Sequence, residues 1–108
     1  MTTEFTARAT PSGDGTVTVT ASGELDMTSA PELITVLREA IRAHGPSRVD
    51  LDLTAVTFMD STGLQVLVAA NRDVGGGLQI TGTSPAVHRL LQLTGVLEEF
   101  GLSPERSA

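Results

Sequence analysis

The most regular pattern in the chain is a strict alternation of polar and apolar positions over residues 16–22, built from threonine, valine, alanine and serine. Alternation with this period predicts a β-strand that buries one face and leaves the other in water. A weaker alternation covers residues 4–10, and a glycine-containing turn at 12–15 separates the two segments. The start of the chain is therefore predicted to form an antiparallel hairpin.

A helical pattern follows this hairpin. Leucine, isoleucine and alanine recur at helical spacing across residues 30–44, and a His-Gly-Pro stop signal stands at 44–46. Ser29 and Glu32 have the spacing of a capping box, with Pro31 in the first turn. We therefore predict a helix from residue 30 to about residue 44 that Ser29 caps.

The remaining chain alternates between short strands and helices. Valine and leucine alternate with aspartate over residues 49–53, which predicts a half-wetted strand that ends before residue 55. A second helix is predicted over 61–73 and is closed by a run of glycines. A fourth strand around 78–80 is followed by a third helix between 84 and 95, with a Ser-Pro start and a glycine stop.

The order β-β-α-β-α-β-α with short connections predicts an α/β fold. Strands that are joined by helices should be parallel, with right-handed crossovers. Because the strands keep one polar face, we expect the helices mainly on the other face, which requires a strand order that follows the chain. The predicted fold is a mixed sheet made of an N-terminal antiparallel hairpin followed by β-α-β-α-β-α units. The polar positions expected on its uncovered face are Thr16, Thr18, Thr20, Asp50 and Asp52.

Composition and charge narrow the possible functions. Thirteen Asp and Glu against seven Arg and no Lys give a net charge of −6, which disfavours direct contact with nucleic acid. The lack of Lys excludes P-loop and Schiff-base chemistry, and the lack of Cys excludes disulfides and thiolate zinc sites. The longest apolar run, 66–70, is too short to span a membrane, and the start of the chain does not resemble a signal peptide. We therefore expect a soluble, cytoplasmic protein.

Residues 60–64, Asp-Ser-Thr-Gly-Leu, lie where a predicted strand meets the first turn of the second helix. Backbone amides in such a turn lack partners within the helix and, together with the helix dipole, favour an anion. This segment is therefore a candidate anion site. The alternative interpretation is structural, with Asp60 or Ser61 as a helix N-cap and Gly63 as a point of close packing.

Asp26 lies on the loop between the second strand and the first helix. Because the second and third strands should be parallel, this loop and the loop that carries Asp60 and Ser61 should open on the same edge of the sheet. A turn or N-cap role is as consistent with the position of Asp26 as a functional one. The sequence predicts no catalytic constellation and no metal site, and we interpret His44 and His88 as surface residues.

Three short motifs occur together in this chain. They are Gly23-Glu24-Leu25-Asp26, then Phe58-Met59-Asp60-Ser61-Thr62-Gly63-Leu64, then Ser84-Pro85-Ala86-Val87 with Arg89, Leu90 and Gly95. In this order and spacing they resemble the STAS-domain anti-sigma factor antagonists of bacteria, over residues 15–97. The resemblance implies a STAS-type fold, with residues 1–108 as a single domain.

The resemblance also implies a function. In that family the residue directly after the motif aspartate, here Ser61, accepts a phosphate from a partner that is both a serine kinase and an anti-sigma factor. The unphosphorylated protein binds this partner and frees a sigma factor, which regulates transcription, and a phosphoserine phosphatase restores it. The partner-binding residues that the resemblance implies are Asp26, Asp60, Ser61, Thr62, Gly63 and Leu64.

By the same resemblance, the protein is not an enzyme and needs no cofactor, because ATP and magnesium belong to the kinase. Relatives usually continue into a further helix after the region that matches 97–102, whereas this chain has only residues 103–108, which we expect to be poorly ordered. The alternative function is a STAS scaffold or accessory subunit of a stress-sensing complex or a transporter. Ser61, with Asp60 before it and Gly63 after it, favours the phosphorylation switch.

Overall fold

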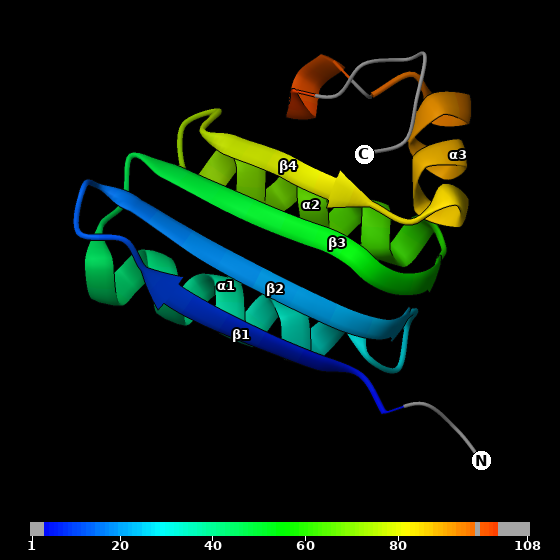
Figure 1. The fold of residues 1–108 in the computed structure, drawn as a ribbon, viewed down its shortest axis with the longest axis horizontal. Helices are drawn as coiled ribbons and strands as arrows, with labels where there is room; N and C mark the ends of the chain where they lie inside the picture. Colours follow the sequence, from blue (N-terminus) through cyan, green and yellow to red (C-terminus); the bar gives the residue numbers. More distant parts are fainter. Residues whose placement is uncertain (1–3, 97, 102–108) are drawn as a thin grey trace.

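The computed structural model of the protein describes residues 4–96 and 98–101. Its elements are β1 (Thr6–Pro11), β2 (Thr16–Leu25), α1 (Ala30–His44), β3 (Arg48–Met59), α2 (Ser61–Asp73), β4 (Leu78–Thr83), α3 (Pro85–Thr94) and the 3₁₀ turn η1 (Glu98–Phe100). The four strands form one mixed sheet in the order β1-β2-β3-β4 (Figure 1). β1 is antiparallel to β2, and the β2–β3 and β3–β4 pairs are parallel. These observations confirm the predicted topology.

Helices α1 and α2 cover one face of the sheet (Figure 1). α1 contacts β1 and β2, α2 contacts β3 and β4, and α3 contacts the same two strands as α2. Over residues 4–96 and 98–101, no α-helix packs across the opposite face of β2 and β3 (Figure 1). This face carries the expected polar side chains, which are exposed or partly exposed: Thr16, Thr18, Thr20, Asp50 and Asp52.

The covered face of the sheet and the facing sides of the helices form one hydrophobic core. Leu33 and Leu37 of α1 and Leu67 of α2 are fully buried against the strands. Burying a leucine stabilises the fold by about 1.5–3 kcal/mol, so these contacts hold the helices on the sheet. The fully buried strand residues include Val17, Val19, Leu25, Val49, Leu51 and Leu53.

β3 is longer than its pattern predicts. We expected it to end before Ala55, but the strand continues to Met59. Two register shifts against β2 insert extra residues into β3 and interrupt the alternation of buried and exposed side chains. At the first of them, the Asp52 carboxylate accepts hydrogen bonds from the Thr54 amide (2.9 Å) and hydroxyl (2.6 Å). Such bulges re-aim side chains within a continuous ladder, so alternation alone ends the strand too early.

The predicted start and stop of α3 are both confirmed. The Ser84 hydroxyl accepts a hydrogen bond from the Val87 amide (3.3 Å) and donates one to the Val56 carbonyl of β3 (2.5 Å). Pro85 lies in the first turn, and Gly95 ends the helix in the left-handed conformation, with φ of 76°. The cap therefore also fixes the start of α3 to the neighbouring strand.

His88 lies on the buried side of α3, so its interpretation as a surface residue is wrong. Its side chain is 7% exposed, and Val87 and Leu91 are fully buried beside it. The inward stripe of α3 runs through positions 87, 88 and 91, which brings the imidazole into the interior. Its two ring nitrogens have no hydrogen-bond partner. His44 is exposed at the end of α1, as predicted.

The apolar pattern of the sequence fades after α3, and the short 3₁₀ turn η1 follows in this part of the chain. Phe100 of η1 is fully buried, and η1 contacts β4. The predicted tail, 103–108, lies outside the described residues. Within the part of the chain that the structure describes, no helix has both the length and the apolar character needed to cross a membrane.

Candidate functional site

The candidate site lies at the edge of the sheet where β2 and β3 end. Leu25 and Met59 are register partners at the ends of these parallel strands. The Asp60 amide donates a hydrogen bond to the Leu25 carbonyl (3.3 Å), which ties the loop after β3 to the end of β2. The loops that carry Asp26 and Asp60 therefore open on the same edge, as the parallel pairing predicts.

Asp60 is the N-cap of α2. Its Oδ1 atom accepts hydrogen bonds from the amides of Thr62 (2.9 Å) and Gly63 (3.3 Å). The carboxylate also lies at the positive end of the helix dipole. Of the two caps that the sequence offers, the structure has Asp60 and not Ser61. Two of the amides that the sequence predicts to be available to an anion are thus already bonded to Asp60.

Ser61 is the first residue of α2, and its side chain is exposed. Thr62 and Leu64, which follow it, are partly buried. Ser61 is therefore accessible at the surface, directly after the capping residue Asp60. Among residues 4–96 and 98–101, no group of three or more His, Asp or Glu side chains is positioned to hold a metal ion.

Gly63 brings the first turn of α2 into close contact with the ends of β2 and β3. A Cβ atom at this position would lie 2.5 Å from Met59 Cγ and 2.9 Å from Leu25 Cγ. These distances are shorter than van der Waals contact, so no larger residue fits without displacing its neighbours. The structural interpretation of Gly63 is therefore confirmed: it allows the close approach that fixes the position of Ser61.

Asp26 organises the loop between β2 and α1. Its Oδ1 atom accepts hydrogen bonds from the amides of Thr28 (2.9 Å) and Ser29 (3.1 Å). The predicted capping box of Ser29 and Glu32 is wrong, because Ser29 has helical backbone angles and makes no cap hydrogen bond. Its hydroxyl donates instead to the Glu24 carbonyl (2.6 Å). α1 still begins at residue 30 as predicted, but Asp26 organises the chain before it.

The same hydrogen bonds lower the pKa of Asp26 below its ordinary value of 3.8, and the amide of Ser29 makes the largest contribution. Donors to a carboxylate favour its charged form. Asp26 therefore carries a full negative charge at neutral pH.

We expect Asp26→Ala to lower the free energy of unfolding at neutral pH but to have progressively less effect in acid. Because the folded-state pKa lies below 3.8, the charged carboxylate stabilises the fold above that pH. This contribution disappears as the pH falls through the lowered pKa. Urea unfolding of the wild type and of Asp26→Ala, from neutral pH to below pH 3.8, measures the difference in their free energies of unfolding. Asp26→Asn keeps an acceptor oxygen and should lose less, and a difference that is constant with pH would contradict the assignment.

The family model of the STAS domain matches residues 7–108, a range that contains both loops and α2. The chain belongs to the STAS domain family. Its predicted resemblance and fold class are therefore confirmed.

Bacterial relatives of this STAS domain are named as anti-sigma factor antagonists. The chain is 32% identical over 87 residues to the anti-sigma F factor antagonist of Paenibacillus polymyxa, covering 78% of this chain and 74% of the relative. It is 37% identical over 81 residues to the anti-sigma-B factor antagonist of Staphylococcus epidermidis, covering 72% and 74%. The crystal structure of an anti-sigma factor antagonist from Mycobacterium paratuberculosis has a similar fold, with a TM-score of 0.82 at 32% identity over 96% of this chain and 91% of that one.

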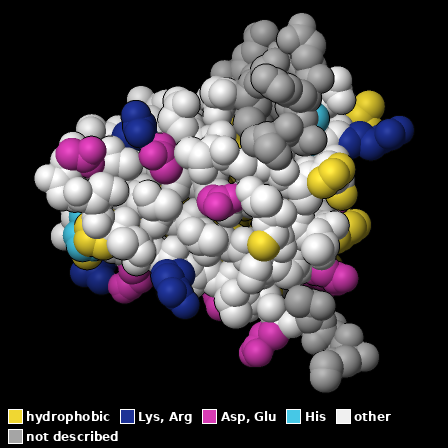
Figure 2. Space-filling model, in the orientation of Figure 1, with side chains coloured by type: hydrophobic (Ala, Val, Ile, Leu, Met, Phe, Trp, Pro, Cys, Tyr) yellow, Lys and Arg dark blue, Asp and Glu magenta, His cyan; other side chains and the backbone are white. Residues whose placement is uncertain are grey.

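Sequence reasoning missed two residues of the STAS domain near this edge. Met27, on the loop after β2, is 76% exposed, and Phe58, near the end of β3, is 48% exposed. The available signal was the apolar pair Phe58-Met59, because two successive strand side chains cannot both enter one core. Met59 takes the inward position and is 5% exposed. Figure 2 shows several separate hydrophobic side chains at the end of the molecule where α3 lies and where β2 and β3 end.

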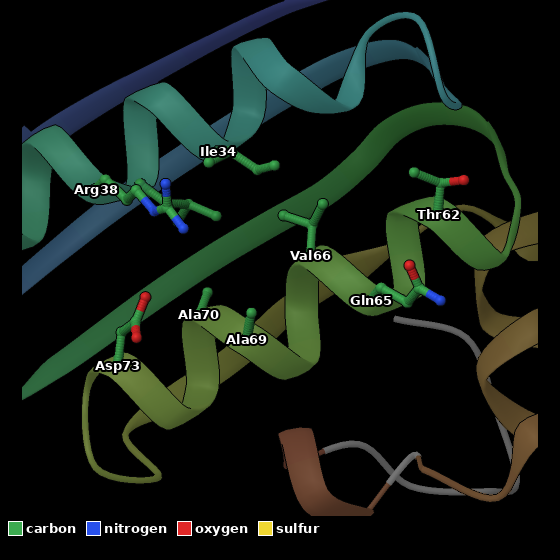
Figure 3. Close-up of a pocket in the computed structure, with 9 residues that line it drawn as sticks. Ile34, Arg38, Thr62, Gln65, Val66, Ala69, Ala70 and Asp73 are labelled. Carbon is green, nitrogen blue, oxygen red and sulfur yellow. The ribbon is translucent and has the colours of Figure 1, made fainter.

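A groove between α1 and α2 of the STAS domain begins beside the candidate site. Thr62 and Gln65 lie at one end, and Arg38 and Asp73 lie on opposite walls at the other (Figure 3). The groove holds about 190 Å³, below the roughly 300–1,000 Å³ of sites that take drug-sized ligands. It therefore suits a single apolar side chain. Its apolar lining consists of Ile34, Leu37, Val66, Ala69 and Ala70.

Proposed function

We propose that this protein is an anti-sigma factor antagonist whose partner binding is switched by phosphorylation of Ser61. In the unphosphorylated form it binds an anti-sigma factor that is also a serine kinase, and so frees a sigma factor for transcription. The observation that carries the proposal is the exposed Ser61 hydroxyl, held beside Asp60 at the start of α2. The names of the relatives support the class of partner.

Some of the residues around Ser61 provide a surface for the partner, and others hold that surface in place. Asp26 and Asp60 each contribute a carboxylate from one of the two loops at this edge of the sheet, and each also binds backbone amides of its own loop. Gly63 sets the depth at which α2 packs on the strands. The proposed partner-binding residues are Asp26, Asp60, Ser61, Thr62, Gly63 and Leu64.

The position of Asp60 explains why a phosphate on Ser61 would act on the partner. Asp60 already accepts the amides of Thr62 and Gly63, so these donors are not free to neutralise a phosphate. A phosphoserine carries a charge of about −1.5 to −2 at neutral pH. Added beside a carboxylate, on a protein of net charge −6, this charge stays at the surface. The partner must desolvate it or meet it with new cations.

In this proposal the protein itself catalyses nothing. The kinase brings ATP and magnesium, and a phosphoserine phosphatase returns the protein to its binding form. The domain provides a phosphate acceptor and a recognition surface, and it acts as a single STAS domain in the bacterial cytoplasm. Its own turnover of ATP, lost in Ser61→Ala, would contradict this part of the proposal.

Incubation with the cognate kinase and ATP, followed by mass spectrometry, tests the proposal. We expect one phosphate on Ser61, none on Ser61→Ala, and normal labelling of Thr35→Ala. The Thr35 variant is the matched control, because this residue is also exposed on a helix but lies on α1, outside the proposed partner-binding residues. Phosphate on Thr62, or on no residue, would refute the switch and favour a scaffold function.

A further inference from the structure

The described residues include four large hydrophobic side chains that are exposed. Single exposed hydrophobic residues are ordinary and need no special explanation. Two of the four, however, lie next to the same residue, Glu24. Phe58 is the register partner of Glu24 on β3, and Met27 lies on the loop that the Ser29–Glu24 hydrogen bond folds back. The four exposed side chains are Met27, Phe58, Val68 and Leu93.

Phe58 is turned outward by the second register shift of β3. Gly23 pairs with Val56, but Glu24 pairs with Phe58, so Thr57 is the extra residue. The Thr57 hydroxyl donates a hydrogen bond to the Gly23 carbonyl at 3.5 Å across this irregularity. Bulges of this kind re-aim side chains. Because of this extra residue, the side chain of Phe58 faces away from the core and that of Met59 faces into it. Phe58 is also only two residues before Asp60 in the chain.

Met27 is held in place by the hydrogen bonds of its loop. The Asp26 carboxylate binds the amides of Thr28 and Ser29, and Ser29 binds the Glu24 carbonyl. The backbone on both sides of Met27 is therefore fixed, although its side chain is 76% exposed. A side chain presented on a fixed backbone loses little further chain entropy on binding. The flexible thioether can adapt to the shape of a recess.

Three carboxylates lie close in the chain or in strand register to these two apolar residues. Glu24 is exposed, and Asp26 and Asp60 are partly exposed on the two adjoining loops. The complementary surface on a partner is an apolar recess edged by Arg or Lys side chains. Met27 directly follows Asp26, and Phe58 is two residues before Asp60, so both apolar residues adjoin the loops of the proposed phosphorylation site.

We propose that Met27 and Phe58 form the apolar anchor with which this domain binds its anti-sigma factor, in a recess that basic side chains border. This inference rests on the proposed function and adds the residues that supply most of the affinity. Anchoring side chains of this kind control how slowly a complex dissociates, whereas bordering charges mainly control how fast it forms.

Surface plasmon resonance with the immobilised anti-sigma factor tests the proposal. We expect Met27→Ala and Phe58→Ala each to weaken binding by about tenfold or more, mainly through faster dissociation. Leu93→Ala is the matched control, because Leu93 is 73% exposed in the last turn of α3. This control should bind like the wild type. Circular dichroism of each variant establishes that the fold is retained, and Met27→Ala is the variant least able to disturb it.

The outcomes separate this inference from the proposed function. If the wild-type protein does not bind the anti-sigma factor, the proposed function fails. If the wild type binds, but Met27→Ala binds equally well, or Leu93→Ala loses as much affinity as Met27→Ala, only the anchor is refuted. Loss of self-association in Met27→Ala, with unchanged affinity for the anti-sigma factor, would assign the surface to a second copy of this chain and overturn the proposal.

Discussion

Phosphorylation of Ser61 is expected to weaken the complex with the anti-sigma factor by more than about 100-fold while the domain stays folded. A buried or poorly matched phosphate imposes a penalty on the order of 3 kcal/mol, and each 1.4 kcal/mol costs about tenfold in affinity. The penalty falls on the complex because Ser61 is exposed and Asp60 already occupies the nearest amides. Isothermal titration of the modified and unmodified proteins with the same partner measures it.

Variants separate the local effect of this phosphate from that of net charge. Ser61→Ala should bind the partner and never be labelled. Ser61→Asp should fold normally and bind about tenfold more weakly, because one carboxylate carries less charge than a phosphate. Gln65→Glu adds the same charge one turn later on the exposed side of α2 and should bind almost normally. Equal affinity of the phosphorylated and unphosphorylated proteins for the partner would contradict the proposed switch.

Gly63→Val is expected to lower the free energy of unfolding by about 3 kcal/mol, because overpacking of a close contact costs about 1–3 kcal/mol or more. The new atoms would overlap Leu25 and Met59, which are both buried. Gly63→Ala should lose less, since alanine regains about 1 kcal/mol of helix propensity. Urea denaturation followed by circular dichroism measures both losses.

Gln65→Val is the matched control for this prediction. It places the same β-branched residue in the same helix, at an exposed position, so it reports the propensity cost without the overlap. We expect a loss of less than about 1 kcal/mol. If Gly63→Val and Gln65→Val are equally stable, Gly63 does not set the approach of α2 to the strands.

The fold could be predicted from the sequence wherever one periodicity held across a whole element. The alternation in β2 gave a strand with one wet face, and helical spacing gave the bounds of α1. β3 departs from this because its two bulges depend on pairing with β2, a strand that is remote in sequence. The burial of His88 was not predicted, because in a short helix the pattern of apolar residues leaves the buried side uncertain by one position. Only the packing of α3 against the sheet decides which positions are buried.

The site was predictable as a location and less so in its contacts. The parallel pairing of β2 and β3 was enough to bring Asp26 and Asp60 to one edge. Local spacing could not show whether the side chain of Ser29 or that of Asp26 binds the free amides before α1, because both carry an oxygen within reach. The backbone angles of Ser29, which are helical, leave this role to Asp26. The exposure of Phe58 could not be predicted, because it depends on the bulge that turns this side chain outward.

The parallel register of β2 and β3 also has a consequence for folding kinetics. The hydrogen bond between Thr57 and Gly23 joins residues 34 positions apart, so the intervening chain must close a loop before these strands pair. The β1–β2 hairpin forms from local contacts, but β2 ends at Leu25, so the hairpin contains neither of the two loops at the Ser61 edge. We therefore expect Ser61 and Asp26 to come together late in folding. Under the proposed function, a kinase that reads both loops would act only on completed domains, and a nascent or unfolded chain would escape modification.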